Sequence, residues 1–434
     1  MPKAKAILAA VLLPALLTAC SAGAEGDVAT LLRAPRLSGQ SSAVQKALNS
    51  YVGGSATLKY PASGDFLSPF LFGDWDGDGT EEAAALYTTD TSSNVWLAVL
   101  EPTEAGDWHV TQVEQGLSSE VASVTYAHLK DPTSQQILVG YGSAQGDLYL
   151  AAYLYGEEEG LQVIIKQNYT EMIVADITGK GDTQDLVLTL PTEMENGGVN
   201  LQLLTNVEGE FRSTQTLAVG AGSYNGCAAL RAGVGNDGAP YLVLDGWAGT
   251  GGSTLASAII IYDAETGFLK TYSPPGLADP YRATLRYDAS LLSMDIDANG
   301  TIDIPTEVSD GGTLSTPMDK RIRFLLWKDF STNTGGNYSF GVYDSQWHMF
   351  LPLPESLHGN ILIRSNQAGT GWLLCNAEGT SVYYELRLVD PAEENADYQR
   401  IATIGSQQLQ VRMVTAYYGL TIDQIEKGII LLNR

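Results

Sequence analysis

Two short acidic stretches, residues 74–82 and 295–303, restrict what this chain can fold into more than any other feature. The first reads Asp-Trp-Asp-Gly-Asp-Gly-Thr-Glu-Glu and the second Asp-Ile-Asp-Ala-Asn-Gly-Thr-Ile-Asp. Both place an oxygen-bearing side chain at positions 1, 3, 5 and 9 and a glycine at position 6. A hard cation such as Ca²⁺ takes six to eight oxygen ligands, and oxygens at every second residue let a tight turn point several of them inward. We therefore predict two calcium sites.

The expected ligands are the side chains at positions 1, 3, 5 and 9 and the backbone carbonyl at position 7. They are Asp74, Asp76, Asp78, Thr80 and Glu82 in the first loop, and Asp295, Asp297, Asn299, Thr301 and Asp303 in the second. Neither loop is an EF-hand, because that motif needs a glutamate at position 12 and flanking helices. Position 12 is Ala85 in the first loop and Thr306 in the second, and the flanks are short β-like runs. The alternative for each loop is an acidic, solvated turn that binds no metal.

The first 19 residues have the pattern of an export signal. Lys3 and Lys5 precede an apolar run from Ala6 to Leu17, which is shorter than the ~20 residues that a membrane span needs. The following Thr18-Ala19-Cys20 resembles the bacterial lipobox, which implies cleavage before Cys20 and lipid on its sulfur. We expect an extracytoplasmic lipoprotein of the bacterial cell envelope that meets the membrane only through this lipid. An ordinary signal peptide with an incidental cysteine is the alternative.

The mature chain is strongly acidic. Loss of Lys3 and Lys5 from the 24 basic residues leaves 22 against 50 acidic ones, so the formal charge moves from −26 to −28. Such a charge repels nucleic acid and anionic lipid and attracts cations. We therefore exclude a nucleic-acid partner, although dispersed acidic residues also serve simply to keep an exported protein soluble.

The remaining cysteines, Cys227 and Cys375, lie in apolar segments. Each is compatible with an unpaired, buried thiol or with a disulfide between the two, and a chain of this length can bury an ample core without one.

The organisation predicted from the sequence is a signal peptide (1–19), a tether with a short helix (20–54) and one all-β domain (55–434). The helix is expected over Ser41–Tyr51, where Val44, Leu48 and Tyr51 recur at helical spacing. From residue 56 onward, short β-like runs alternate with Gly, Asp, Asn and Ser turns. Gly accounts for 46 of 434 residues and charged residues for only 17%, which fits many turns and little exposed helix.

The end of the chain predicts one more helix and a closing strand. Thr421-Ile422-Asp423-Gln424 has the form of a capping box, and Gly428 ends the helix. Residues 429–432 are expected to form a strand that pairs near Leu58 and closes a ring of sheets, because closure hides the sheet edges.

Weaker copies of the acidic turn recur along the chain. Anchors near residues 74, 128, 176, 233 and 295 are spaced by roughly 50 to 60 residues, the size of a four-stranded propeller blade. In the copy that begins at Asp176, Lys180 occupies the third ligand position, where its ammonium would clash with a dication but could replace its charge. The copy at Gly233 keeps the turn and loses most ligands. We predict that both of these copies are empty.

Phe72-Gly73 followed by the first acidic loop, together with the second loop, resembles FG-GAP/VCBS repeats, which are the blades of integrin-alpha-like β-propellers. The resemblance is clear over two loops and weaker over two or three more. It implies an all-β propeller, for which six or seven four-stranded blades suit the length. In that family calcium sits in a hairpin loop within a blade and rigidifies it. The side chains that inherit the ligand role are Asp74, Asp76, Asp78, Glu82, Asp295, Asp297, Asn299 and Asp303.

Catalytic motifs give no support for an enzyme. The four histidines show no HExxH spacing, and no GxSxG motif is present. Residues 233–238 match GxGxxG but lead into Pro240 and a β-like run, so no helix N-terminus awaits a phosphate. Paired carboxylates for glycoside cleavage stay open among the 50 acidic residues, because their pairing is spatial.

The function predicted from the sequence is a non-catalytic, calcium-stabilised propeller lipoprotein, a monomer that offers a binding or adhesion surface to a protein or polysaccharide. The alternative is a secreted propeller hydrolase or lyase acting on polysaccharide. An enzyme should gather carboxylates with perturbed pKa values in a concave pocket, whereas a scaffold should keep its acids in the calcium loops and scattered outside. The tryptophans and tyrosines are expected mainly in the core, with a surface platform for sugars or peptides as the alternative.

Overall fold

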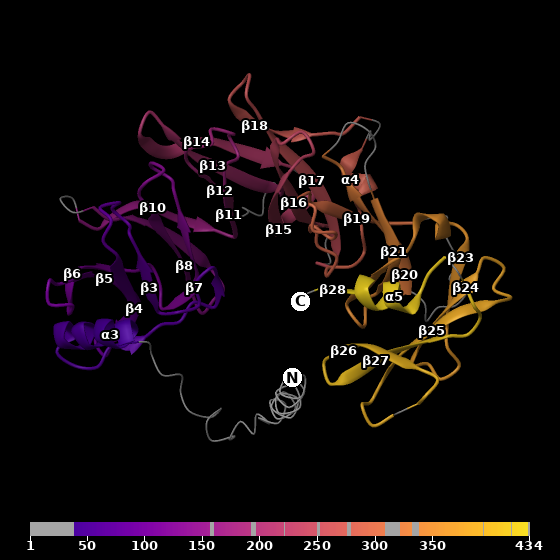
Figure 1. The fold of residues 1–434 in the computed structure, drawn as a ribbon. Helices are drawn as coiled ribbons and strands as arrows, with labels where there is room; N and C mark the ends of the chain where they lie inside the picture. Colours follow the sequence, from indigo (N-terminus) through magenta and orange to yellow (C-terminus); the bar gives the residue numbers. More distant parts are fainter. Residues whose placement is uncertain are drawn as a thin grey trace, which may run out of the picture.

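Six sheets, antiparallel except for the parallel pair β2–β7, follow one another along the chain in the computed structural model. It describes residues 39–432 apart from 157–159, 192–196, 221, 250–251, 276–278, 309–321, 332–337, 394 and 418. The predicted signal peptide and Cys20 lie outside the described residues. The sheets are arranged in chain order around an arc, with the first sheet and the last one at its two separated ends (Figure 1).

The strands of the first three sheets, named here A, B and C, have the following bounds. Sheet A contains β1 (Thr57–Leu58), β3 (Phe70–Gly73), β4 (Glu82–Thr89), β5 (Ser92–Pro102) and β6 (Trp108–Gln115). Sheet B contains β2 (Ser63–Gly64), β7 (Glu120–Ala127), β8 (Gln136–Gly142), β9 (Leu148–Leu154) and β10 (Gln162–Tyr169). Sheet C contains β11 (Glu171–Ala175), β12 (Asp185–Leu190), β13 (Val199–Val207) and β14 (Glu210–Val219).

Sheets D, E and F complete the array. Sheet D contains β15 (Tyr224–Val234), β16 (Pro240–Ala248), β17 (Thr254–Asp263) and β18 (Phe268–Tyr272). Sheet E contains β19 (Asp303–Glu307), β20 (Ile322–Asp329), β21 (Tyr338–Asp344), β22 (Met349–Pro352) and β28 (Ile430–Leu431). Sheet F contains β23 (Ile361–Ser365), β24 (Gly371–Asn376), β25 (Val382–Val389), β26 (Gln399–Ile404) and β27 (Gln407–Met413). The helices are α3 (Gly39–Val52), α4 (Pro280–Ala283), η3 (Glu355–Leu357) and α5 (Ile422–Gly428).

The burial of individual strands shows that the sheets stack face to face. The second strands β4, β8 and β12 are buried along almost their whole length, whereas β6 and β14 carry many exposed side chains. A strand is buried on both faces only when its sheet is covered on both sides. The expectation of an all-β domain built around four-stranded antiparallel sheets is therefore confirmed.

Hydrophobic clusters join each sheet to the next one in the chain. Separate clusters link A to B, B to C, C to D, D to E and E to F. Within the described ranges, no such cluster joins F back to A. A closed ring of six or seven blades stays a prediction, because the described residues form six sheets in an arc whose ends are apart (Figure 1).

Helix α3 covers the face of sheet A that has no neighbouring sheet among the described residues. The predicted N-terminal helix is present, and its Val44 and Leu48 are buried against the face of sheet A that points away from sheet B. Tyr51, which was expected on the same apolar face, is 55% exposed because it lies in the last turn of the helix, beyond this contact. The helix thus takes the place that a neighbouring blade would occupy in a closed ring.

The predicted closing strand exists but pairs elsewhere. β28 pairs with β22 in sheet E, and Leu58 of β1 pairs with Tyr87 in sheet A. The expectation that the C-terminal strand pairs near Leu58 is wrong, since the C-terminal segment completes the edge of sheet E instead. The capping box of α5 is confirmed, with reciprocal bonds between Thr421 and Gln424 and a helix end at Gly428.

Cys227 and Cys375 are both free, so the alternative of a disulfide between them is excluded. No helix within the described ranges has the length and apolar composition to cross a membrane.

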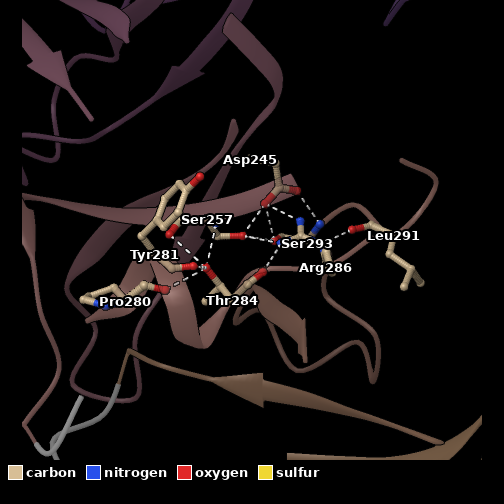
Figure 2. Close-up of polar contacts among 8 residues, drawn as sticks. All are labelled: Asp245, Ser257, Pro280, Tyr281, Thr284, Arg286, Leu291 and Ser293. Carbon is tan, nitrogen blue, oxygen red and sulfur yellow. Dashed lines mark hydrogen bonds and ion pairs between the residues drawn. The ribbon is translucent and has the colours of Figure 1, made fainter. Parts of the chain in front are cut away.

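A buried polar network holds the connection between sheets D and E in place (Figure 2). Arg286 Nη2 lies 2.7 Å from Asp245 Oδ1, and both side chains are almost fully buried. The same carboxylate accepts hydrogen bonds from Ser257 Oγ (2.5 Å), Ser293 N (2.6 Å) and Ser293 Oγ (2.7 Å). Thr284 Oγ1 in turn accepts from Ser257 N at 2.8 Å. These contacts anchor the segment that leads to the second acidic loop onto β16 and β17.

Replacement of Arg286 by methionine should destabilise the protein by about 3–5 kcal/mol, because it leaves the Asp245 carboxylate buried without a counter-charge. Urea unfolding monitored by tryptophan fluorescence measures the change. The matched control is Arg282→Met in the same segment, where the guanidinium is exposed and the expected loss is within about 1 kcal/mol. Equal effects of the two substitutions would contradict this account of the network.

Candidate metal centres

The two acidic loops occupy equivalent places, each between paired backbone positions of one sheet. The first connects β3 to β4, where Gly73 pairs with Glu82. The second precedes β19, where Met294 forms an isolated bridge with Asp303. In both cases the residue before the loop pairs with the residue at position 9, so the hairpin brings the ends of the loop together.

Backbone N–H groups of the first loop turn its carboxylates inward. Asp74 accepts from Gly77 N at 2.8 Å and from Gly79 N at 2.9 Å. Asp76 accepts from Asp78 N at 3.1 Å, and Asp78 accepts from Thr80 N at 2.6 Å. Each bond runs from a later residue back to an earlier side chain, which is the pattern of successive Asx turns.

The second loop repeats this pattern with one amide in place of a carboxylate. Asp295 accepts from Asn299 N at 3.0 Å and from Gly300 N at 2.8 Å. The side-chain oxygen of Asn299 accepts from the N–H and the hydroxyl of Thr301 at 2.7 and 2.6 Å. The amide at position 5 leaves three carboxylates at the predicted ligand positions of this loop, against four in the first.

Two positions of each loop, not one, adopt a positive φ angle. Position 6, where the sequence places a glycine in both loops, is Gly79 (φ 90°) or Gly300 (φ 89°). Position 4 is Gly77 (φ 81°) in the first loop but Ala298 (φ 61°) in the second. Sequence reasoning missed this second requirement, although the glycine at position 4 of the first loop was a visible signal. Left-handed backbone at an alanine costs roughly 1 kcal/mol, so the second loop carries local strain.

The closing carboxylate and a buried side chain at position 2 hold each loop against the core. Trp75 N donates to Glu82 Oε2 at 2.8 Å, and Ile296 N donates to Asp303 Oδ2 at 3.3 Å. Trp75 is fully buried and Ile296 nearly so. The carboxylate at position 9 therefore belongs to the predicted ligand set and also holds the backbone of the buried residue at position 2. The sequence did not predict this second role.

The structure brings together seven of the predicted ligand side chains. One carboxylate oxygen from each of Asp74, Asp76, Asp78 and Glu82 lies within 4.8 Å of the others, and the same holds for Asp295, Asp297 and Asp303. Asn299 lies in the second loop, with its side-chain oxygen bonded to Thr301. The carbonyl role expected of Thr80 and Thr301 stays a prediction.

The electrostatics of the two groups favour a bound cation. Burial raises the pKa of Glu82 to about 7, and the carboxylates of Asp76, Asp78 and Asp74 add to the shift. Burial likewise raises the pKa of Asp303 to about 7, with Asp297, Asp329 and Asp295 adding to it. Glu82 is only 3% exposed and Asp303 only 4%. Crowded, all-oxygen carboxylate groups of this kind match the ligands that Ca²⁺ prefers, so the residues fit the ion.

A further acidic residue lies opposite the second site. Asp303 pairs directly with Asp329 of β20, and Asp329 is itself buried. The Asp329 carboxylate accepts from Ser331 N at 2.7 Å and from Asn236 Nδ2 at 3.4 Å. The sequence pattern did not single out Asp329, because its proximity arises from strand pairing between β19 and β20.

The weaker copy of the loop near His128 forms the same turn, but the residue at its closing position is uncharged. Leu129 N donates to Gln136 Oε1 at 2.6 Å, and Ala127 pairs with Gln136, as in the acidic loops. Burial would raise the pKa of Asp131, but hydrogen bonds from Ser134 and Thr133 outweigh it and lower the pKa to about 2. The carboxylate in this loop is thus already stabilised by its own turn.

The copy near Asp176 keeps the hydrogen bonds of this turn, but the side chain of its lysine points out of the loop. Asp176 accepts from Lys180 N and Gly181 N, each at 2.9 Å, and Asp185 accepts from Thr178 N at 2.7 Å. The Lys180 ammonium donates to Thr205 Oγ1 at 3.1 Å and to the carbonyl of Asn206 at 2.6 Å. The suggestion that it replaces the charge of a cation among the loop carboxylates is therefore wrong, because this long side chain reaches the end of β13.

Two hollows outside the acidic loops carry polar or aromatic side chains. A hollow of 470 Å³ lies along β2, β7 and β11, and its lining includes Asp65 and Glu171. Burial raises the pKa of Glu171, and the nearby Arg231 opposes the shift. A hollow of 500 Å³ beside the end of α3 is lined by Tyr51, Tyr87 and Trp96 among others.

No known protein family matches the chain, and no curated protein is similar to it in sequence. A solved structure of the Dos1 propeller is similar over 80% of this chain and 69% of that chain, with 10% sequence identity and a TM-score of 0.31.

Without metal, the protein should become less stable as pH rises from about 4 to about 7. The folded-state pKa values of Glu82 and Asp303 exceed their ordinary values, so the folded state holds protons that the unfolded state has lost. Calcium should cancel this loss by neutralising the carboxylates, so its stabilising effect should grow with pH. Thermal melts with calcium and with chelator at about pH 5 and about pH 8 measure the difference.

The matched variant is Glu82→Gln, which copies the neutral Gln136 of sheet B. It should raise the stability of the metal-free protein at the higher pH and remove the calcium effect of the first site. A calcium effect of the same size at both pH values would contradict the expected titration.

Proposed function

We propose that this chain is a non-catalytic scaffold of the propeller type, stabilised by two calcium ions and exported to the bacterial cell envelope, where lipid on Cys20 holds it. The observation that carries the proposal is the pair of carboxylate groups, each drawn within 4.8 Å by a turn of the same design. A group of like charges that is partly buried is unfavourable alone and becomes favourable around a dication.

The binding role is supported by the surface of the first sheet. Beyond the end of helix α3, the hollow is lined by the exposed Tyr51 and the half-buried Trp96, together with Asp90 and Ser55. Tyr87 is buried beneath them. Aromatic rings beside polar groups suit a sugar ring or an extended peptide. The proposed partner is accordingly a polysaccharide or a protein at the cell surface, and the protein acts as a monomer.

Calcium should raise the melting temperature, because an ion that binds only the folded state stabilises it by mass action. At free calcium about a hundredfold above Kd, each site should contribute about 2.7 kcal/mol. Calorimetry should find two sites in the native chain and one in Asp76→Ala or Asp297→Ala, and the double variant should lose the response.

The control variant is Asp182→Ala, an exposed acidic residue in the copy near Asp176 that is predicted to be empty. It should leave both calcium sites intact. An unchanged calcium response in the Asp76→Ala, Asp297→Ala double variant would show that the two loops are not the binding sites.

A second candidate function, polysaccharide cleavage, is favoured by one observation. Asp65 and Glu171 line the same 470 Å³ hollow, and a carboxyl group with a raised pKa is suited to act as a general acid. Our proposal expects no release of reducing ends or unsaturated products from a panel of neutral and acidic polysaccharides. Turnover that Glu171→Gln abolishes, and that the exposed Glu120→Gln does not, would replace the scaffold with an enzyme.

A further inference from the structure

The first acidic loop is bonded to sheet B as well as to its own sheet. The carbonyl of Trp75 accepts from Gln135 N at 3.2 Å, and Tyr126 OH donates to the carbonyl of Phe72 at 3.3 Å. The Trp75 ring meets the Tyr126 ring edge-on at 6.2 Å, within the cluster that joins sheets A and B. The backbone of Trp75 therefore links the carboxylates of the loop to sheet B. Its N–H donates to Glu82, and its carbonyl accepts from Gln135 N, next to β8.

The second acidic loop is bonded to sheet D in a similar way. The carbonyl of Gly300 accepts from Val234 N at 3.1 Å, while Gly300 N donates to Asp295 at 2.8 Å. Ile302 N donates to Tyr241 OH at 2.5 Å, next to the closing carboxylate Asp303. Here too a single residue, Gly300, faces the carboxylate group with its N–H and the neighbouring sheet with its carbonyl.

The junction between sheets B and C lies at the same place in the fold, but the described carboxylates of its two loops, such as Asp131, Asp176 and Asp185, do not form a cluster like those of the two acidic loops. Gln184 N donates to the carbonyl of His128 at 2.7 Å, and His128 N donates to Gln184 Oε1 at 2.9 Å. Beside them, the Lys180 ammonium is bonded to Thr205 and Asn206, and the Asn206 side chain donates to the carbonyl of Leu129 at 3.4 Å. This junction is held by groups that the chain itself supplies.

We propose that the cation in each acidic loop fastens two neighbouring sheets, so that calcium holds the A–B and D–E junctions closed and leaves the B–C junction unaffected. The inference rests on the proposed calcium binding. Without the cation, repulsion among the carboxylates spreads each loop and displaces Trp75 and Gly300, whose carbonyls accept the bonds from the next sheet. Among the described residues the first and last sheets are not packed together, so no contact between them resists such opening, and the two junctions act as calcium-dependent hinges.

Hydrogen exchange of the full chain, with calcium and with chelator, tests the inference. Removal of calcium should accelerate exchange by about tenfold or more in the peptides that contain Gln135, which immediately precedes β8, and Val234, which ends β15. Neither residue supplies a ligand. The peptide that contains Gln184 is an internal control and should not change. Asp76→Ala should reproduce the effect at Gln135 alone, and Asp297→Ala at Val234 alone, with Asp182→Ala leaving both protected.

The possible failures are distinguishable. Calcium binding measured by calorimetry together with unchanged exchange at Gln135 and Val234 would overturn the fastening and leave the proposed function intact. Equal acceleration at Gln184 would also overturn it, because the effect would then be a general loss of stability. An absence of calcium binding would remove both the proposed function and this inference.

Discussion

Burial of both faces of each sheet is the constraint on which the rest of this structure depends. A short four-stranded sheet with apolar side chains on both sides is stable only when something covers each side. Inside the array the neighbouring sheets provide this cover, and the inner strands are accordingly apolar along nearly their whole length. At the first sheet α3 provides it through Val44 and Leu48. The arc can therefore begin with a helix where a ring would have had another sheet.

The turn that opens four of the sheets recurs with different residues at its closing position, and at Gln136 this residue is uncharged. Four sheets repeat it: an N–H near the start of the loop donates to a side chain seven residues later, at Glu82, Gln136, Asp185 and Asp303. This turn sets the hairpin and buries an apolar residue between sheets. The residues at the loop positions then decide whether this turn is charged or neutral. Carboxylates at alternate positions create the two groups around which we propose calcium, and a glutamine leaves the turn neutral.

Local sequence predicted the elements that depend on near neighbours. The acidic loops, the capping box at Thr421 and the helix over residues 39–52 are set by contacts within a few residues, and each is found where the pattern indicated it. What the pattern missed lies across strands or sheets. Asp329 faces Asp303 through strand pairing, and the buried Asp245–Arg286 pair joins residues 41 apart in the chain. No periodicity marks such partners.

The sequence by itself determined that the chain would form short strands with acidic turns between them, because turn glycines, alternate oxygens and β-branched runs act over a few residues. Only the tertiary structure decided which element covers which face: that β28 completes sheet E, that α3 covers sheet A, and that Lys180 reaches the end of β13. Those choices depend on competition among apolar surfaces that are distant in the chain and similar in composition. Which element covers a given face depends on how well the surfaces fit and on how the chain connects them. A local sequence pattern contains neither kind of information.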